Sequence, residues 1–142
     1  MRSESPQAVA SAITCLRLFG IDIPPHPTWE HVQTESEAIW HNLKGQSIES
    51  LIDLPLMSDP EMRAAMDMLS ALLPPAYFTD HQLFCLLVCR LVNVSVQHGT
   101  TGASALAYGY CGVILGAVSH RYSEGYRFAK LACDLVDIGT DV

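Results

Sequence analysis

Apolar side chains recur along most of this chain at the three- and four-residue spacing of an α-helix. In the first such segment Ile13 and Leu16 follow that spacing, and Gly20 interrupts it. Ser5 followed by Pro6 is typical of a helix start, since proline lacks an N–H donor that the first turn does not need. The first helix is therefore expected to begin near Ser5 and to stop before Gly20.

The connector that follows, residues 21–27 (IDIPPHP), holds three prolines and is incompatible with a helix. Thr28 then stands where a helix N-cap is expected, and the second helix should run to about Leu43. Gly45 is the type of residue that ends a helix, and Ser47 can cap a further short segment.

Ser58 and Glu61 have the spacing of a capping box, in which each side chain bonds the other residue's backbone N–H. An apolar stripe follows this pair, and Pro74-Pro75 is expected to end the helix. The stripe consists of Met62, Met66, Leu69 and Leu73.

Thr79 and Gln82 form a second predicted capping box, whose helix should end near His98-Gly99. Two more helices are predicted over about 103–118 and 123–136. No segment alternates between polar and apolar residues with the period of a strand. The sequence thus predicts one all-α domain over residues 1–142, with six or seven antiparallel helices joined by short loops.

Small residues suggest how the last two helices meet. Gly125, Ala129 and Ala132 share one face of the final helix, and Gly112 lies in the helix before it. Residues without bulk at these places allow two antiparallel helices to approach closely, as in a tetratricopeptide-type hairpin. The sequence separation between Gly112 and Gly125 is one residue longer than the corresponding separation in a usual tetratricopeptide repeat.

Charge narrows the range of partners. The formal net charge is −7, so nucleic acid is not expected as a partner, because phosphate binding requires a basic face. Between His81 and His120 the only formally charged side chain is Arg90. A stretch with so little charge is expected to form a core or an interface.

Membrane insertion is not expected, because the apolar runs are shorter than the roughly 20 residues that a span requires. The N-terminus lacks the basic and apolar regions of a signal peptide. Five cysteines without paired spacing indicate reduced thiols, and together these features predict a cytoplasmic protein.

The stretch HNLKGQS, residues 41–47, is similar to the signature of a histidine phosphotransfer domain. In that reading His41 accepts the phosphoryl group, Lys44 steadies its charge and Gly45 leaves room for a receiver domain. The phosphotransfer helix must continue through the glycine, whereas here the sequence changes character after Gly45. We favour a helix end at this point and keep phosphotransfer as the alternative.

Other chemistry finds little support in the sequence. His81, Cys85 and Cys89 are spaced along one helix, but structural zinc sites use four ligands and no second cluster is present. No nucleophile elbow, phosphate-binding loop or zinc-protease motif occurs. We expect no catalytic residue, no metal and no cofactor.

A resemblance to a known protein family is found in the segment that begins at Leu51, LIDLPLMSDPEMRAAMDMLSALLPPAYFTDHQLFCLLVCRLVNVSVQHGTTGASALAYGYCGVILG. It resembles part of the very large bacterial, notably cyanobacterial, signalling proteins that join a serine/threonine kinase, a STAND-type ATPase, helical repeats, a GAF domain and a sensor histidine kinase. The resembling segment follows the ATPase module and covers about Ala8 to Val136. Around GAVSHRY the chain departs from that family, in which a Gly-Asp-Tyr-type turn is more usual.

The resemblance implies a non-catalytic, tetratricopeptide-like module that binds a partner protein or neighbouring domains of a kinase or ATPase. It also implies that the chain is a fragment or a truncated copy of a larger protein. A small helical domain that senses a ligand in an apolar pocket is a further alternative. Repeats missing after the last hairpin would leave an apolar face bare, so we expect a homodimer through Tyr126, Leu131 and Leu135.

Overall fold

The computed structural model describes residues 5–118 and 120–140, and helices account for most of this part of the chain. The elements are α1 (Ser5–Leu18), α2 (Trp29–Leu43), the 3-10 helix η2 (Ile48–Asp53), α3 (Pro60–Ala71), α4 (Leu73–Thr79), α5 (His81–His98), α6 (Gly102–Ala117) and α7 (Tyr122–Thr140). The β-type pairing among these residues is a single isolated bridge between Leu56 and Thr100. The predicted all-α class is confirmed.

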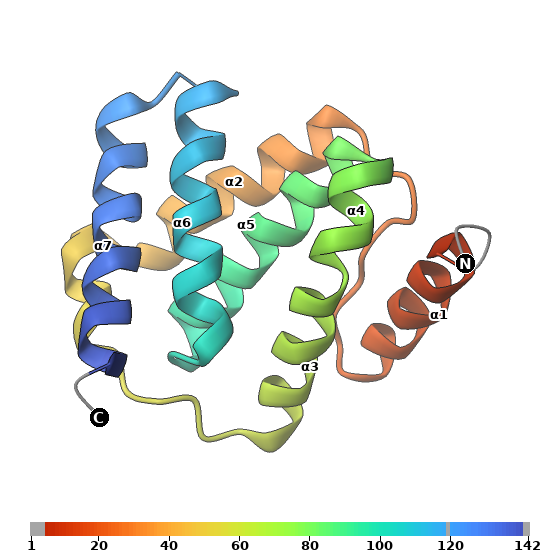
Figure 1. The fold of residues 1–142 in the computed structure, drawn as a ribbon, viewed down its shortest axis with the longest axis horizontal. Helices are drawn as coiled ribbons and strands as arrows, with labels where there is room; N and C mark the ends of the chain where they lie inside the picture. Colours follow the sequence, from red (N-terminus) through yellow and green to blue (C-terminus); the bar gives the residue numbers. More distant parts are fainter. Residues whose placement is uncertain (1–4, 119, 141–142) are drawn as a thin grey trace.

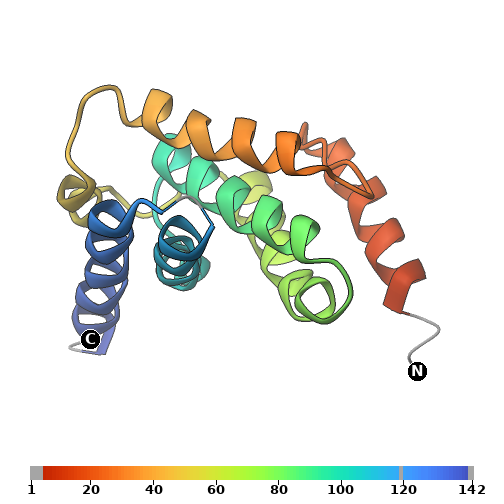
Figure 2. The same ribbon diagram turned by 90° about the horizontal axis from the view of Figure 1, so that it is seen from above.

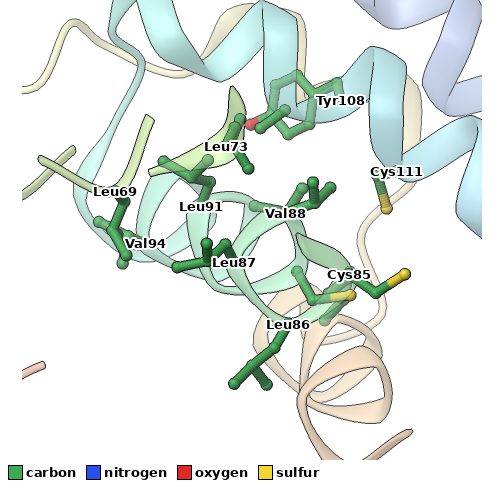
Figure 3. Packing of buried hydrophobic residues seen from close by; sticks show 14 of the residues in the cluster. Leu69, Leu73, Cys85, Leu86, Leu87, Val88, Leu91, Val94, Tyr108 and Cys111 are labelled. Carbon is green, nitrogen blue, oxygen red and sulfur yellow. The ribbon is translucent and has the colours of Figure 1, made fainter. Parts of the chain in front are cut away.

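Helix α5 lies at the centre of the molecule. Helix α2 runs along one side of it, while α3, α4 and the α6–α7 pair lie on its other sides (Figures 1 and 2). Figure 3 looks along α5, where Leu86 points away from Val88 and Leu91, and all three side chains are buried. A helix buried on several sides needs apolar residues around most of its circumference, which explains why this segment carries so little charge.

Helix α2 begins and ends where the sequence predicts. The Thr28 hydroxyl accepts a hydrogen bond from the backbone N–H of His31, and the His31 ring accepts one from the Thr28 N–H. The helix ends at Leu43, because Lys44 and Gly45 adopt left-handed backbone with φ of 54° and 80°. The short helix η2 that follows is capped by Ser47, also as predicted.

Two predicted caps are wrong by one residue. Helix α3 is capped by Asp59, whose carboxylate accepts from the Glu61 N–H, and not by Ser58. A residue before proline is driven to extended backbone, and Pro60 therefore places Asp59 in the conformation that an N-cap requires. Helix α5 is capped by Asp80, which accepts from the Leu83 N–H, and not by Thr79.

Pro74 and Pro75 do not end a helix as predicted, since they lie in the first turn of α4. Helix α3 has already ended at Ala71, and the chain turns through Leu72 into the new helix. Prolines are tolerated there because the N–H groups of a first turn have no partner within the helix. The additional helix extends to Thr79, which is why the α5 cap moves to Asp80.

Helices α6 and α7 form the close antiparallel pair that the small residues predict (Figure 1). A Cβ atom on Gly112 would lie 2.5 Å from the Gly125 carbonyl oxygen and 3.2 Å from the Ala129 Cβ. Further along the pair, a Cβ on Gly109 would meet the Ala132 Cβ at 3.6 Å. The backbones therefore touch at the Gly112–Gly125 crossing, where no side chain fits.

Helices α2 and α5 instead run in the same direction and are joined by polar groups. Arg90 Nε lies 3.0 Å from the Glu35 carboxylate, and Asn93 donates to the same carboxylate at 2.7 Å. Two turns further along α2, Asn42 donates to the side-chain oxygen of the same Asn93 at 2.9 Å. Asn93 is buried and the Glu35–Arg90 pair is largely buried, so these bonds fix the register of α2 on α5. Whether the helices form tetratricopeptide-like repeats stays a prediction.

Candidate functional site

His41 lies in water near the end of α2, and its surroundings differ from those of a phosphotransfer site. The helix has two further residues after His41, and the Lys44 backbone N–H closes the last turn by donating to the His41 carbonyl oxygen. Because Lys44 and Gly45 have left the helix, they do not continue the helical face of His41. The arrangement supports the helix end favoured from the sequence, and phosphotransfer itself stays untested.

The cysteines of α5 and α6 lie in the core. Cys85, Cys89 and Cys111 are buried, and burial raises the pKa of Cys85 to about 11 and that of Cys111 to about 12. Burial also raises the pKa of Cys89 well above its ordinary value, so all three thiols are protonated at neutral pH. Among residues 5–118 and 120–140, no group of three or more His, Cys, Asp or Glu side chains is placed to hold a metal ion.

The three residues predicted to form a dimer face do not share an exposed surface. Tyr126 is 69% exposed, whereas Leu131 is 3% exposed and belongs to the core of its own chain. Leu135 is partly buried and packs against that core. The final helix turns its leucines inward against α6, and of these three residues only Tyr126 is free to meet another molecule.

A cluster of aromatic side chains instead gathers where α4, α5 and α6 meet. The aromatic face, as we call it, consists of Tyr77 and Phe78 of α4, Phe84 of α5, and Leu106 and Tyr110 of α6. The Phe84 ring centroid lies 5.3 Å from the centroids of both Tyr77 and Tyr110, in edge-to-face contact. The ring centroid of Phe78 lies 5.2 Å from that of Tyr77, and the Phe78 residue is 82% exposed.

The aromatic face surrounds a surface hollow of about 410 Å³, which is completed by Ser70, Leu73 and Pro74. None of these lining residues is charged, and their polar groups are hydroxyls. Such a surface can bury apolar groups of another molecule. An exposed aromatic cluster of this kind is a typical protein-binding feature.

The sequence interpretation missed the aromatic face for two reasons. It ended one helix at Pro74-Pro75 and began the next at the Thr79 cap, so it assigned Tyr77 and Phe78 to no helix, whereas both belong to α4. The face is also assembled from three helices, and no spacing along the chain brings Phe84 and Tyr110 together. The useful signal was the run AYF directly after the two prolines, which is too apolar for an exposed loop.

In the part of the chain that the structure describes, no helix is long and apolar enough to cross a membrane. Comparisons with protein-family models, with curated proteins and with solved structures found no match to the chain. The function is therefore inferred from the surfaces of the molecule and from the resemblance that its sequence carries.

Proposed function

We propose that this chain is a non-catalytic helical module that binds an amphipathic helix of a partner protein through the aromatic face. The proposed setting is the one that the sequence resemblance implies, a bacterial signalling protein in the cytoplasm. There the module would couple its partner to the kinase or ATPase domains of a larger protein.

The observation that carries this proposal is the exposure of Tyr77 and Phe78 around an uncharged hollow. Aromatic residues are enriched in protein interfaces, where they bury a large area at little conformational cost. A hollow of about 410 Å³ can receive one or two large aliphatic or aromatic side chains. A helix that projects such side chains at a three- and four-residue spacing is the partner element that fits.

The proposal can be tested with a labelled synthetic helix that carries leucine on one face and glutamine on the other. Fluorescence anisotropy should show saturable binding to the wild-type chain. Phe78→Ser and Leu106→Ser should each weaken binding about tenfold or more, since burying one large apolar side chain contributes roughly 1.5–3 kcal/mol. Glutamine leaves the peptide neutral, so the net charge of the module does not drive the binding.

Leu18→Ser is the matched control, because Leu18 is 84% exposed but lies on α1, outside the aromatic face. This variant should bind the helix as the wild type does. Equal losses in Leu18→Ser and Phe78→Ser would mean that the peptide binds any exposed apolar residue. That result, or no binding by the wild type, would contradict the proposal.

The phosphotransfer alternative has its own direct measurement. Incubation with an autophosphorylated sensor kinase should leave no acid-labile phosphate on this chain, and His41→Gln should fold as the wild type does. Phosphate on His41 that passes to a receiver aspartate would replace the proposed function with a relay function.

A further inference from the structure

A second hollow, of about 400 Å³, lies between α2, the C-terminal end of α6 and the turn that joins α6 to α7. It shares no residue with the aromatic face. One stripe of α2 faces it, because the α2 residues that line it recur every three or four positions. The lining residues are Trp29, Val32, Gln33, Ser36, Glu37, Trp40, Ile114, Val118 and Arg121.

Arg121 is held in this hollow by its contact with an indole. Its guanidinium carbon lies 4.9 Å from the Trp40 ring centroid, and its backbone N–H donates to the Leu115 carbonyl oxygen at 2.8 Å. Trp40 is itself anchored by Phe128, a buried core residue with its ring centroid 6.0 Å away. Stacking occupies the face of a guanidinium and leaves its N–H edge available for a carboxylate.

No ion pair joins Arg121 to another residue within 5–118 and 120–140, in contrast to Arg90 and Arg127, which pair with Glu35 and Glu49. Glu37 lines the same hollow and likewise has no cationic partner among those residues. The hollow is therefore lined by one positive and one negative side chain, neither of which is joined in an ion pair within the described residues.

We propose that this hollow binds a free α-amino acid with an apolar side chain. Arg121 would pair with the α-carboxylate, and Glu37 would receive the α-ammonium group. The side chain would lie against Val32, Ile114 and the indole of Trp29, which is 47% exposed. A hollow of about 400 Å³ is within the size range of small-molecule sites, roughly 300–1,000 Å³.

A zwitterion fits better than a simple anion or cation. A carboxylate alone would be repelled by Glu37, and an ammonium ion alone by Arg121. The end of a peptide chain carries only one of the two charged groups on its terminal residue. A free amino acid supplies both, and the proposed site is independent of the partner helix on the aromatic face.

The chain contains two tryptophans, and both line this hollow, so intrinsic fluorescence reports directly on it. Titration with L-phenylalanine or L-leucine, which contain no indole, should change the tryptophan emission in a saturable way. L-Phenylalanine amide lacks the carboxylate and N-acetyl-L-phenylalanine lacks the ammonium group. Each derivative should bind about tenfold more weakly or worse, since each loses a charge-assisted contact.

Arg121→Gln and Glu37→Gln should each weaken L-phenylalanine binding by roughly tenfold or more, because each removes one charged partner. Arg63→Gln is the matched control, since it removes an exposed cation on α3 and should leave binding unchanged. Circular dichroism of each variant checks that the fold is retained.

Three outcomes would overturn the proposal. The first is an unchanged tryptophan emission with millimolar L-phenylalanine and L-leucine, when isothermal calorimetry also detects no heat. The second is equal binding of the amide or the N-acetyl derivative, which would assign the site to a peptide terminus. The third is binding that survives both Arg121→Gln and Glu37→Gln.

Discussion

Gly112 and Gly125 set the separation of α6 and α7 because each occupies the place where the other helix's backbone passes. A Cβ on Gly125 would lie 2.6 Å from the Gly112 carbonyl oxygen, so the exclusion of side chains is mutual. The sequence predicted this contact correctly, because the two helices are adjacent in the chain and their small residues stand on facing sides. Gly109, in the same helix as Gly112, has no such backbone neighbour.

Gly112→Ala should destabilise the fold, whereas Gly109→Ala should not. The new methyl group at residue 112 meets a carbonyl oxygen at 2.5 Å, and overpacking of this kind costs about 1–3 kcal/mol. At residue 109 the methyl finds ordinary contact at 3.6 Å, and alanine in a helix is up to about 1 kcal/mol better than glycine. Urea unfolding of both variants measures the difference. Equal stabilities would show that the two helices separate without cost.

The bidentate ion pair between Glu49 of η2 and Arg127 of α7 should give the stability a pH dependence in acid. Hydrogen bonds from the Arg127 guanidinium, at 2.6 and 2.7 Å, lower the pKa of Glu49 from 4.5 to about 2. The folded-state pKa is the lower one, so the ion pair stabilises the fold fully above pH 4.5 and loses this effect as the pH falls towards 2.

Glu49→Gln should therefore flatten the dependence of unfolding free energy on pH between about 4.5 and 2. Both side chains are exposed, so salt should reduce the effect. Arg127→Gln should remove the same part of the pH dependence, which provides a matched control. Acid unfolding curves that fall in parallel for wild type and Glu49→Gln would contradict this assignment.

At the scale of elements, helix boundaries were predictable to within a residue wherever a single type of side chain can cap the backbone. Thr28 and Ser47 were identified correctly, because no second Ser, Thr, Asp or Asn stands beside either of them. Ser58 and Thr79 each precede an aspartate, and the sequence alone does not tell which of the two neighbours caps the helix. Pro60 determines which residue caps α3, and the length of α4 determines which residue caps α5.

Asp80→Ala should destabilise the protein more than Thr79→Ala does. The Asp80 carboxylate caps α5, and loss of an N-cap costs about 1 kcal/mol. The Thr79 hydroxyl donates to the Pro75 carbonyl oxygen on an exposed face of α4, where a hydrogen bond contributes less. Thermal unfolding followed by circular dichroism would rank the two. A larger loss for Thr79→Ala would restore the cap predicted from sequence.

At the scale of the whole molecule, the charge-poor segment 81–120 serves two purposes. Most of α5 is core, as its central position requires (Figure 1). Helix α6 is buried along the side that faces α5 and α7, yet Leu106, Tyr110 and Val113 remain exposed. Sequence composition predicted a core or an interface here. It did not show which residues form each, because that division depends on how the neighbouring helices cover the segment.

An uncovered aromatic face should also make the isolated chain associate with itself. Phe78 is 82% exposed beside a hollow that can receive an aromatic ring, so two copies related by a two-fold axis can exchange Phe78 side chains. Sedimentation velocity should show a concentration-dependent dimer at micromolar concentration, and Phe78→Ser should abolish it.

Tyr126→Ser is the control. Tyr126 is 69% exposed on α7, whereas Leu131, which was predicted to share its dimer surface, is buried in the core. The leucine–glutamine helix should compete with the dimer, because both need the same hollow. A dimer that is abolished by Tyr126→Ser and unaffected by Phe78→Ser would place self-association on α7, as the sequence first suggested, and would separate it from partner binding.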